Sequence, residues 1–163
     1  RRQESHMAQI EKLEVQVDVK SSPERFYETY LRENYLLPKV SPNEVRDAQL
    51  LKGEWDSVGS VIQYSFAPEG NVSSHIDFLQ IDTIDEENKS ITYTVLDGSE
   101  AKKYYKNCRM TVHALEKSEG GGSSVKVYIE YEKQNEASPA PTRYTEFANV
   151  VYKNIDAYII NNA

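Results

Sequence analysis

The apolar residues of this chain change period close to Pro141, and this change restricts the fold more than any other feature. Before it, short runs alternate apolar and polar residues, most clearly in residues 10–19. After it, apolar residues recur at steps of three and four from Tyr144 to Ile159, with Asp156 on the polar side. Alternation is typical of half-buried strands, and steps of three and four are typical of an amphipathic helix. The sequence therefore predicts strands followed by one long C-terminal helix.

The segment before Pro141 holds further strands between turns rich in Gly, Pro, Asp and Asn. Ser22 as N-cap and Pro23 at the first helical position predict a short helix that reaches Arg32. A second short helix is expected around 36–38, and a hairpin loop at 68–71. Strands are expected, besides 10–19, at 45–51, 60–67, 73–84, 90–96, 104–115 and 124–134.

This order of elements predicts an α+β fold. Strands that follow one another through short turns pair antiparallel. The apolar face of such a sheet must be covered, and only the C-terminal helix is long enough to cover it. A bent sheet around one helix is hard to fill with side chains, so an internal cavity is physically possible, although the periodicity alone does not require one.

Length and charge exclude several classes of protein. Residues 1–6 precede Met7 and are interpreted as the remnant of an expression tag, so residues 7–163 form one expected domain. The net charge is −7 and no basic stripe is present, which argues against a nucleic-acid partner. No apolar run is long enough to span a membrane. The lone Cys108 fits a reducing compartment, and a cytoplasmic location is expected.

Four sequence strings, in order, resemble one plant family. They are LLPKVSP at 36–42, GEWDSVGSVI at 53–62, YTVLDG at 93–98 and IEYEK at 129–133. Together they are similar to the major latex protein branch of the birch-pollen-allergen superfamily. The resemblance implies a helix-grip fold: a seven-stranded curved antiparallel sheet around a long C-terminal helix, with two short helices after the first strand. It also implies an internal hydrophobic cavity and cytosolic residence in a plant.

Members of that family divide between carriers and enzymes. Some bind sterols, flavonoids, hormones and other apolar metabolites, and a few act as cofactor-free enzymes of alkaloid or iridoid pathways. The resemblance thus leaves two functions open, a carrier of a small apolar metabolite and a cofactor-free cyclase or isomerase acting on an enol or carbonyl intermediate. A third interpretation, a protein-interaction scaffold, does not explain the tyrosine-rich inward faces. A homodimer is left open, and no cofactor is expected.

Three residues are candidates for catalysis. His75 and Asp77 lie two positions apart on one expected strand, so their Cα atoms are about 6.6 Å apart. A carboxylate beside an imidazole can fix its tautomer and raise its pKa. With the hydroxyl of Tyr93, the pair is able to move a proton on or off a carbonyl compound. The alternative places His75 and Asp77 in water at the open end of the sheet.

The expected cavity lining combines strand faces, where Tyr104, Lys106 and Cys108 share the inward side, with the helices. Simple core packing is the alternative for each of these residues. Cys108 is expected as a buried thiol, and no metal-ligand set has the required spacing. The candidate ligand-binding residues are Tyr30, Leu37, Leu79, Tyr104, Cys108, Met110, Ile129, Tyr144, Phe147 and Val151.

Overall fold

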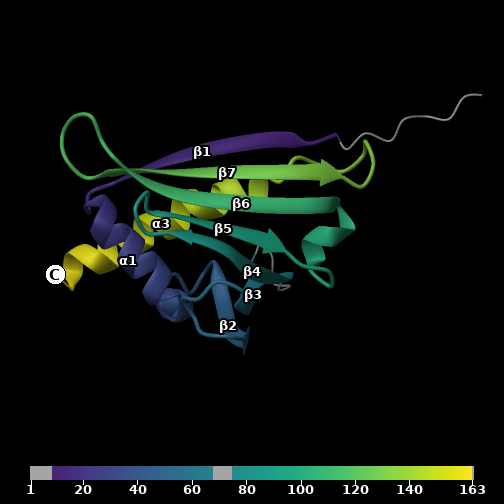
Figure 1. Cartoon of the computed structure of the whole chain (residues 1–163), viewed down its shortest axis with the longest axis horizontal. Helices are drawn as coiled ribbons and strands as arrows, with labels where there is room; N and C mark the ends of the chain where they lie inside the picture. The colour runs from purple at the N-terminus through teal and green to yellow at the C-terminus, as the bar shows by residue number, and fades with distance from the viewer. Residues whose placement is uncertain (1–8, 68–74, 163) are drawn as a thin grey trace, which may run out of the picture.

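The computed structural model describes residues 9–67 and 75–162 (Figure 1). The predicted hairpin loop at 68–71 and the first two residues of the strand predicted at 73–84 lie outside these ranges. The strands are β1 Glu11–Val19, β2 Val45–Lys52, β3 Val61–Phe66, β4 His75–Asp85, β5 Ser90–Val95, β6 Tyr105–Glu116 and β7 Ser123–Lys133. The helices are α1 Pro23–Arg32, α2 Leu37–Val40 and α3 Thr142–Asn161, with 3-10 turns η1 Asn34–Leu36 and η2 Glu100–Lys103.

All seven strands form one antiparallel sheet in the order β1-β7-β6-β5-β4-β3-β2. Consecutive strands from β2 to β7 are neighbours, and β1 joins the far edge beside β7. Register shifts interrupt the β2–β3, β4–β5 and β6–β7 pairs. Such bulges bend a sheet, and the bent sheet lies in front of α3 in Figure 1. The predicted α+β architecture is therefore confirmed.

The first strand and helix form where the sequence predicts them. In β1 the alternating apolar residues face α3, and Val17 and Val19 are buried. The hydroxyl of Ser22 accepts the backbone N–H of Arg25, which satisfies one of the free donors at the start of α1. The expected second short helix is present as η1 followed by α2.

One prediction about the C-terminal helix is wrong. Asp156 was expected on the polar side but is buried, and its carboxylate accepts the backbone N–H groups of Lys20 and Ser21 at 2.8 and 2.9 Å. Tyr152, which the helical pattern did not single out, is buried as well. The buried face of α3 is therefore wider than the apolar pattern predicted. The chain between β1 and α1 crosses the helix at this point, and its backbone N–H groups need an acceptor.

The start of β6 also differs from the prediction. Strict alternation placed Tyr104 and Lys106 on the inward side, but Lys106 is exposed and Tyr105 is buried. Tyr104 follows η2 and directly precedes the strand. A register shift between Tyr105 and Asn107 changes the facing of the first residues, and alternation resumes with Cys108 inward.

The loop from Gly53 to Ser60 joins β2 to β3 and needs a glycine at its start. Gly53 has φ +78°, and a Cβ there would lie 2.4 Å from the Oγ of Ser60. That Oγ instead accepts the backbone N–H of Glu54 at 3.0 Å. Arg32 of α1 contacts this loop through an ion pair with the Asp56 carboxylate at 2.8 Å. The loop is therefore fixed against the end of α1.

Candidate functional site

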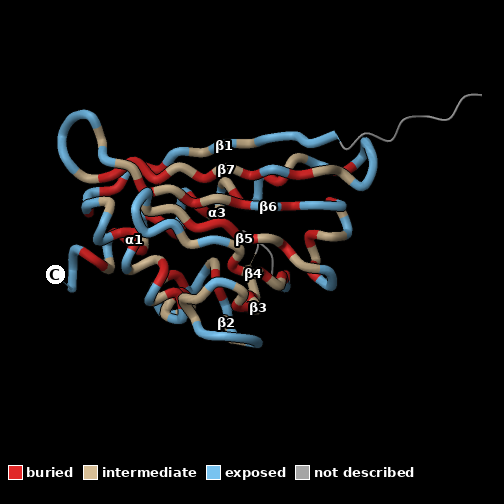
Figure 2. The backbone as a smooth tube through the Cα atoms, in the orientation of Figure 1, coloured by how far each residue is buried: buried red, intermediate tan, exposed pale blue. Residues whose placement is uncertain are grey.

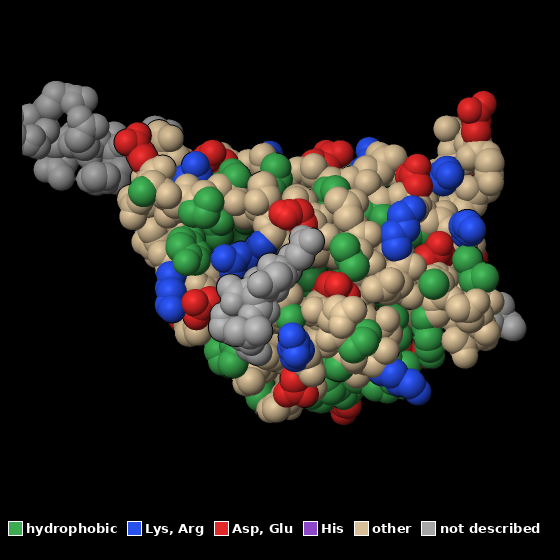
Figure 3. Space-filling model, turned by 180° about the vertical axis from the view of Figure 1, so that it is seen from behind, with side chains coloured by type: hydrophobic (Ala, Val, Ile, Leu, Met, Phe, Trp, Pro, Cys, Tyr) green, Lys and Arg blue, Asp and Glu red, His purple; other side chains and the backbone are tan. Residues whose placement is uncertain are grey.

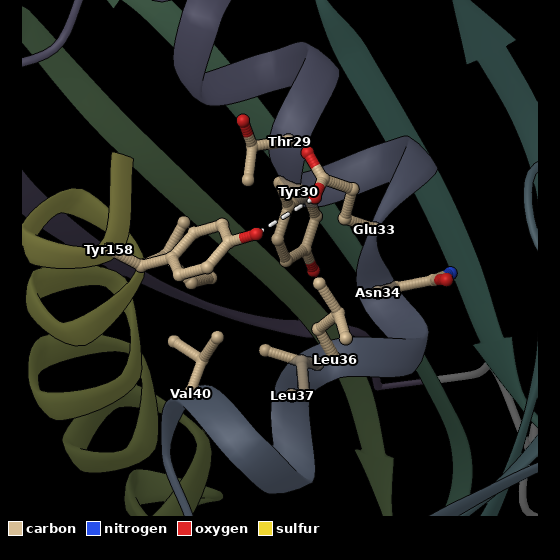
Figure 4. Close-up of a pocket in the computed structure, with 9 residues that line it drawn as sticks. Thr29, Tyr30, Glu33, Asn34, Leu36, Leu37, Val40 and Tyr158 are labelled. Carbon is tan, nitrogen blue, oxygen red and sulfur yellow. Dashed lines mark hydrogen bonds between the residues drawn. The ribbon is translucent and has the colours of Figure 1, made fainter. Parts of the chain in front are cut away.

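A small pocket opens between the helices, where α1 and α2 approach the C-terminal half of α3 (Figure 4). Its volume is about 10 Å³, roughly the room that one water molecule needs. Side chains must therefore move before a larger molecule enters by this route. The lining residues are Thr29, Tyr30, Glu33, Asn34, Leu36, Leu37, Val40, Ile155 and Tyr158.

A hydrogen bond crosses this pocket. The Tyr158 hydroxyl of α3 donates to Glu33 Oε1, at the end of α1, over 3.1 Å (Figure 4). The bond to Glu33 raises the pKa of Tyr158. It joins the two elements that must separate if the pocket is to widen.

Behind the pocket, four tyrosines from different elements form a tyrosine cluster: Tyr30 of α1, Tyr64 of β3, Tyr93 of β5 and Tyr152 of α3. The ring of Tyr30 packs edge-on against Tyr152 at 5.4 Å and Tyr93 at 6.5 Å between centroids. Its hydroxyl interacts with the hydroxyls of the same two residues. The interior next to the pocket therefore has aromatic rings as its walls and phenol hydroxyls at its centre.

The hydroxyls of the tyrosine cluster stay protonated. Burial, followed by the neighbouring tyrosines, raises the pKa of Tyr93 and Tyr152 well above the usual range. Burial likewise raises the pKa of Tyr64. A protonated phenol both donates and accepts, so these groups are able to hold a hydroxyl or carbonyl oxygen of a guest molecule.

A second polar group occupies the start of β4 and of α3. His75 and Asp77 are buried, with 5 % and 0 % of their surface exposed, so the alternative that they lie in water is wrong. His75 Nε2 lies 2.9 Å from Asp77 Oδ2, which also accepts the Tyr144 hydroxyl at 2.6 Å. Asp77 Oδ1 accepts the backbone N–H of Ala101 in η2. This Asp77 network links the sheet to α3 and η2.

Both ring nitrogens of His75 have polar partners. Arg143 contacts His75 Nδ1 and also lies 3.1 Å from Nε2, the nitrogen that faces the Asp77 carboxylate. Burial raises the pKa of Asp77, but the hydrogen bonds from His75, Tyr144 and Ala101 outweigh it and lower the pKa overall. Asp77 is an ionised carboxylate whose two oxygens are both engaged.

Cys108 lies near this network and is inert as a nucleophile. Burial and the charge of Asp77 raise the pKa of its thiol to about 12. The buried thiol agrees with the interpretation made from the sequence. Arg143 lies over the ring of Tyr104 at 5.7 Å, so this predicted ligand residue contacts the rim of the Asp77 network.

The structure separates the residues proposed for catalysis. Tyr93 belongs to the tyrosine cluster, and no hydrogen bond among the described residues joins it to His75 or Asp77. Tyr144 takes the position next to Asp77 that was expected for Tyr93. Of the predicted ligand residues, Tyr30 and Leu37 line the pocket. Tyr104 and Tyr144 lie at the Asp77 network. The remaining six pack in the core or against it: Leu79, Cys108, Met110, Ile129, Val151, and Phe147, whose ring meets Phe66 at 5.0 Å.

Sequence reasoning missed three contributors to these sites. Tyr152 follows Val151 directly, and a broader helical face would have included it. Tyr158 lies within the apolar stripe predicted from Tyr144 to Ile159 and was given no role in a site. Arg143 gave no signal, because its contact with His75 joins residues 68 positions apart.

The pocket, the core and the element order define a class of fold: a curved antiparallel sheet that grips a long C-terminal helix. The chain belongs to the pathogenesis-related protein Bet v 1 family, whose profile matches residues 8–162. MLP-like protein 34 of Arabidopsis thaliana is 30 % identical over 97 % of this chain, which spans 49 % of that relative's length. MLP-like protein 165 of the same plant is 32 % identical over 93 % of this chain and 97 % of its own.

Solved structures of other proteins have the same fold. Ginseng major latex-like protein 151 from Panax ginseng superposes with a TM-score of 0.83 and 32 % identity, covering 91 % of this chain and 97 % of that one. Norcoclaurine synthase from Thalictrum flavum, solved in complex with dopamine and hydroxybenzaldehyde, superposes with a TM-score of 0.73 at 14 % identity. It covers 96 % of this chain and 90 % of its own, and at this identity the likeness shows the fold alone.

Two further findings concern membrane spans and metal sites among the described residues. Within 9–67 and 75–162, no helix is both long and apolar enough to cross a bilayer. In the same ranges no group of three His, Cys, Asp or Glu side chains is arranged to hold a metal ion. On the face in Figure 3, acidic and basic side chains are interspersed.

Proposed function

We propose that this protein binds a small, largely apolar plant metabolite carrying hydroxyl or carbonyl oxygens, as a carrier or buffer in the cytoplasm, in specialised metabolism or defence. The observation that supports this most directly is the tyrosine cluster behind the helix pocket. Tyr93 and Tyr152 are buried yet have mainly other tyrosines as hydroxyl partners. Apolar pockets with a few placed polar groups are the usual form of small-molecule sites.

Binding requires the rings to make room. The pocket has room for about one water molecule, and Tyr30, which lines it, packs against Tyr93 and Tyr152. Rotation of Tyr30, together with loss of the Tyr158–Glu33 bond, would join the pocket to the cluster. The guest would then replace contacts between rings and accept hydrogen bonds from the freed phenols.

The binding test uses an apolar fluorescent probe, 1-anilinonaphthalene-8-sulfonate, and its displacement by hydroxylated and by non-hydroxylated polycyclic compounds. We expect saturable one-to-one binding, and the hydroxylated compounds should displace the probe more strongly. Tyr93→Phe and Tyr152→Phe keep the ring and should reduce that preference by about tenfold. Tyr128→Phe on β7 is the matched control. Absence of binding, or a preference unchanged in both variants, would refute the proposal.

A cofactor-free cyclase or isomerase acting on a reactive enol or carbonyl intermediate of alkaloid or iridoid biosynthesis is the second candidate. The buried imidazole of His75 beside an ionised carboxylate favours it, because such a pair is able to move protons. Against it, both ring nitrogens and both carboxylate oxygens already have partners. Turnover that falls in His75→Ala or Asp77→Asn, with probe affinity unchanged, would favour the enzyme; an effect on affinity alone favours the carrier.

A further inference from the structure

The outer edge of β1 is open along its first half. β1 is the edge strand at the top of Figure 1, paired only with β7. Near its end, Lys153 donates to the carbonyl of Asp18, and Asp156 accepts the N–H of Lys20. Even-numbered residues therefore turn their backbone groups away from β7. From residue 10 to 16, no other described residue bonds these outward groups.

The same half of β1 leaves apolar side chains partly uncovered. Val17 and Val19 are 2 % and 4 % exposed beneath α3. Leu13 and Val15 point to the same side but are only half-buried, and Ile10 is 50 % exposed. Figure 2 shows this change along the strand, from exposed and intermediate to buried. Open backbone and uncovered apolar surface thus coincide in residues 10–16.

The sequence of this stretch is complementary to itself in one antiparallel register. With a twofold axis at Leu13, Leu13 meets its own copy on the inner side of the sheet. On the outer side, Lys12 of each copy stands opposite Glu14 of the other. Lys12 and Glu14 are both even-numbered, so their outward N–H and C=O groups form the new hydrogen bonds. Opposite charges in directly facing positions stabilise an antiparallel pair, and like charges destabilise it.

We propose that two copies of this chain associate through the β1 edges in this register, forming a continuous sheet across a homodimer. This association goes beyond the binding of a small ligand. A register centred on Val15 would place Lys12 opposite Asp18, whose carbonyl Lys153 already occupies. The other edge, β2, has two register shifts against β3, which make it a poor partner for a straight strand. The small contact area makes the dimer weak and transient.

A cysteine cross-link tests the register. Leu13→Cys brings two thiols together across a non-hydrogen-bonded pair, where Cβ atoms are close enough for a disulfide. Val15→Cys places them roughly 13 Å apart, since they are offset by four residues. Under mild oxidation we expect a covalent dimer for Leu13→Cys and little for Val15→Cys. The unchanged protein, with only buried Cys108, is the control. Cross-linking of Val15→Cys alone would overturn the register.

A charge exchange tests the interface without touching the apolar side. Sedimentation of the full chain over a concentration series should show a monomer–dimer equilibrium. Glu14→Lys should weaken the association by about tenfold. It sets a lysine opposite Lys12 of the other copy, and the twofold axis repeats this repulsive pair. The double variant Lys12→Glu/Glu14→Lys should restore the association, and Glu146→Lys on the exposed side of α3 should leave it unchanged. A monomer at all concentrations, or no rescue in the double variant, would overturn the proposal.

Discussion

The two polar regions inside this fold differ in how completely their groups are paired. In the Asp77 network, one carboxylate receives hydrogen bonds from a side chain of β4, a backbone N–H of η2 and a phenol of α3. In the tyrosine cluster, the hydroxyls of Tyr30, Tyr93 and Tyr152 interact mainly with one another. The first region holds fixed charges, and the second holds neutral groups that are able to exchange partners.

This difference indicates separate roles. A buried network whose groups are all satisfied fixes the elements that it joins, and it loses much free energy when one member is removed. Neutral phenols with few partners lose little when a guest replaces their contacts. We therefore assign structural support to the Asp77 network and ligand contact to the tyrosine cluster. The following changes test that assignment.

Removal of the Asp77 carboxylate should have the largest effect. Asp77→Ala leaves His75, Tyr144 and the N–H of Ala101 without their acceptor, all in the interior. We expect a loss of about 3–5 kcal/mol in the free energy of unfolding, measured by urea denaturation. Asp97→Ala, at an exposed carboxylate, is the control and should change little. A small loss in Asp77→Ala would mean that this region too is adaptable.

Asp156 should come second. Asp156→Ala removes the acceptor of the N–H groups of Lys20 and Ser21, where β1 passes into α1. We expect a loss of about 2–3 kcal/mol. Glu146→Ala, on the exposed side of the same helix, controls for helix propensity. Equal stability of the two variants would show that water satisfies the crossing backbone.

Acid should destabilise the Asp77 network selectively. Because the pKa of Asp77 is lower in the folded state, its contribution is fully present above the unfolded value of about 4. It is lost as pH falls further through the folded pKa. Below pH 4, the free energy of unfolding should therefore fall more steeply in the unchanged protein than in Asp77→Asn. Parallel slopes in urea titrations at each pH would argue against an ionised Asp77.

The pocket at the helices should respond with the smallest change in stability. Tyr158→Phe removes the bond to Glu33 across the pocket and keeps the ring. We expect little change in the unfolding midpoint but faster association of the fluorescent probe in stopped-flow mixing. Tyr35→Phe, at an exposed tyrosine of η1, is the control. An unchanged association rate would indicate that a guest enters elsewhere.

Sequence reasoning succeeded where the signal was local. The N-cap at Ser22, the alternation in β1 and the helical period of α3 follow from neighbouring residues. His75 and Asp77 were paired correctly because two positions on one strand share a face. Tyr93 was assigned to them wrongly as a neighbour, because strand alternation gives the face of a residue but not its distance along the sheet.

Contacts between distant segments escaped prediction for a related reason. Asp156 looked like a surface residue because its partners lie more than 130 positions away. A carboxylate is buried only when fixed donors replace its water, and the sequence does not show which donors arrive.

The sequence by itself determined the strands, the helices and the antiparallel pairing of consecutive strands, because each depends on period, turns and capping residues close in the chain. Only the tertiary structure decided which polar side chains meet inside, and hence that Asp77 is saturated while the tyrosines are not. Hydrogen bonds act over a few ångströms in space, and a bulge of one residue is enough to change which side chains come within that range.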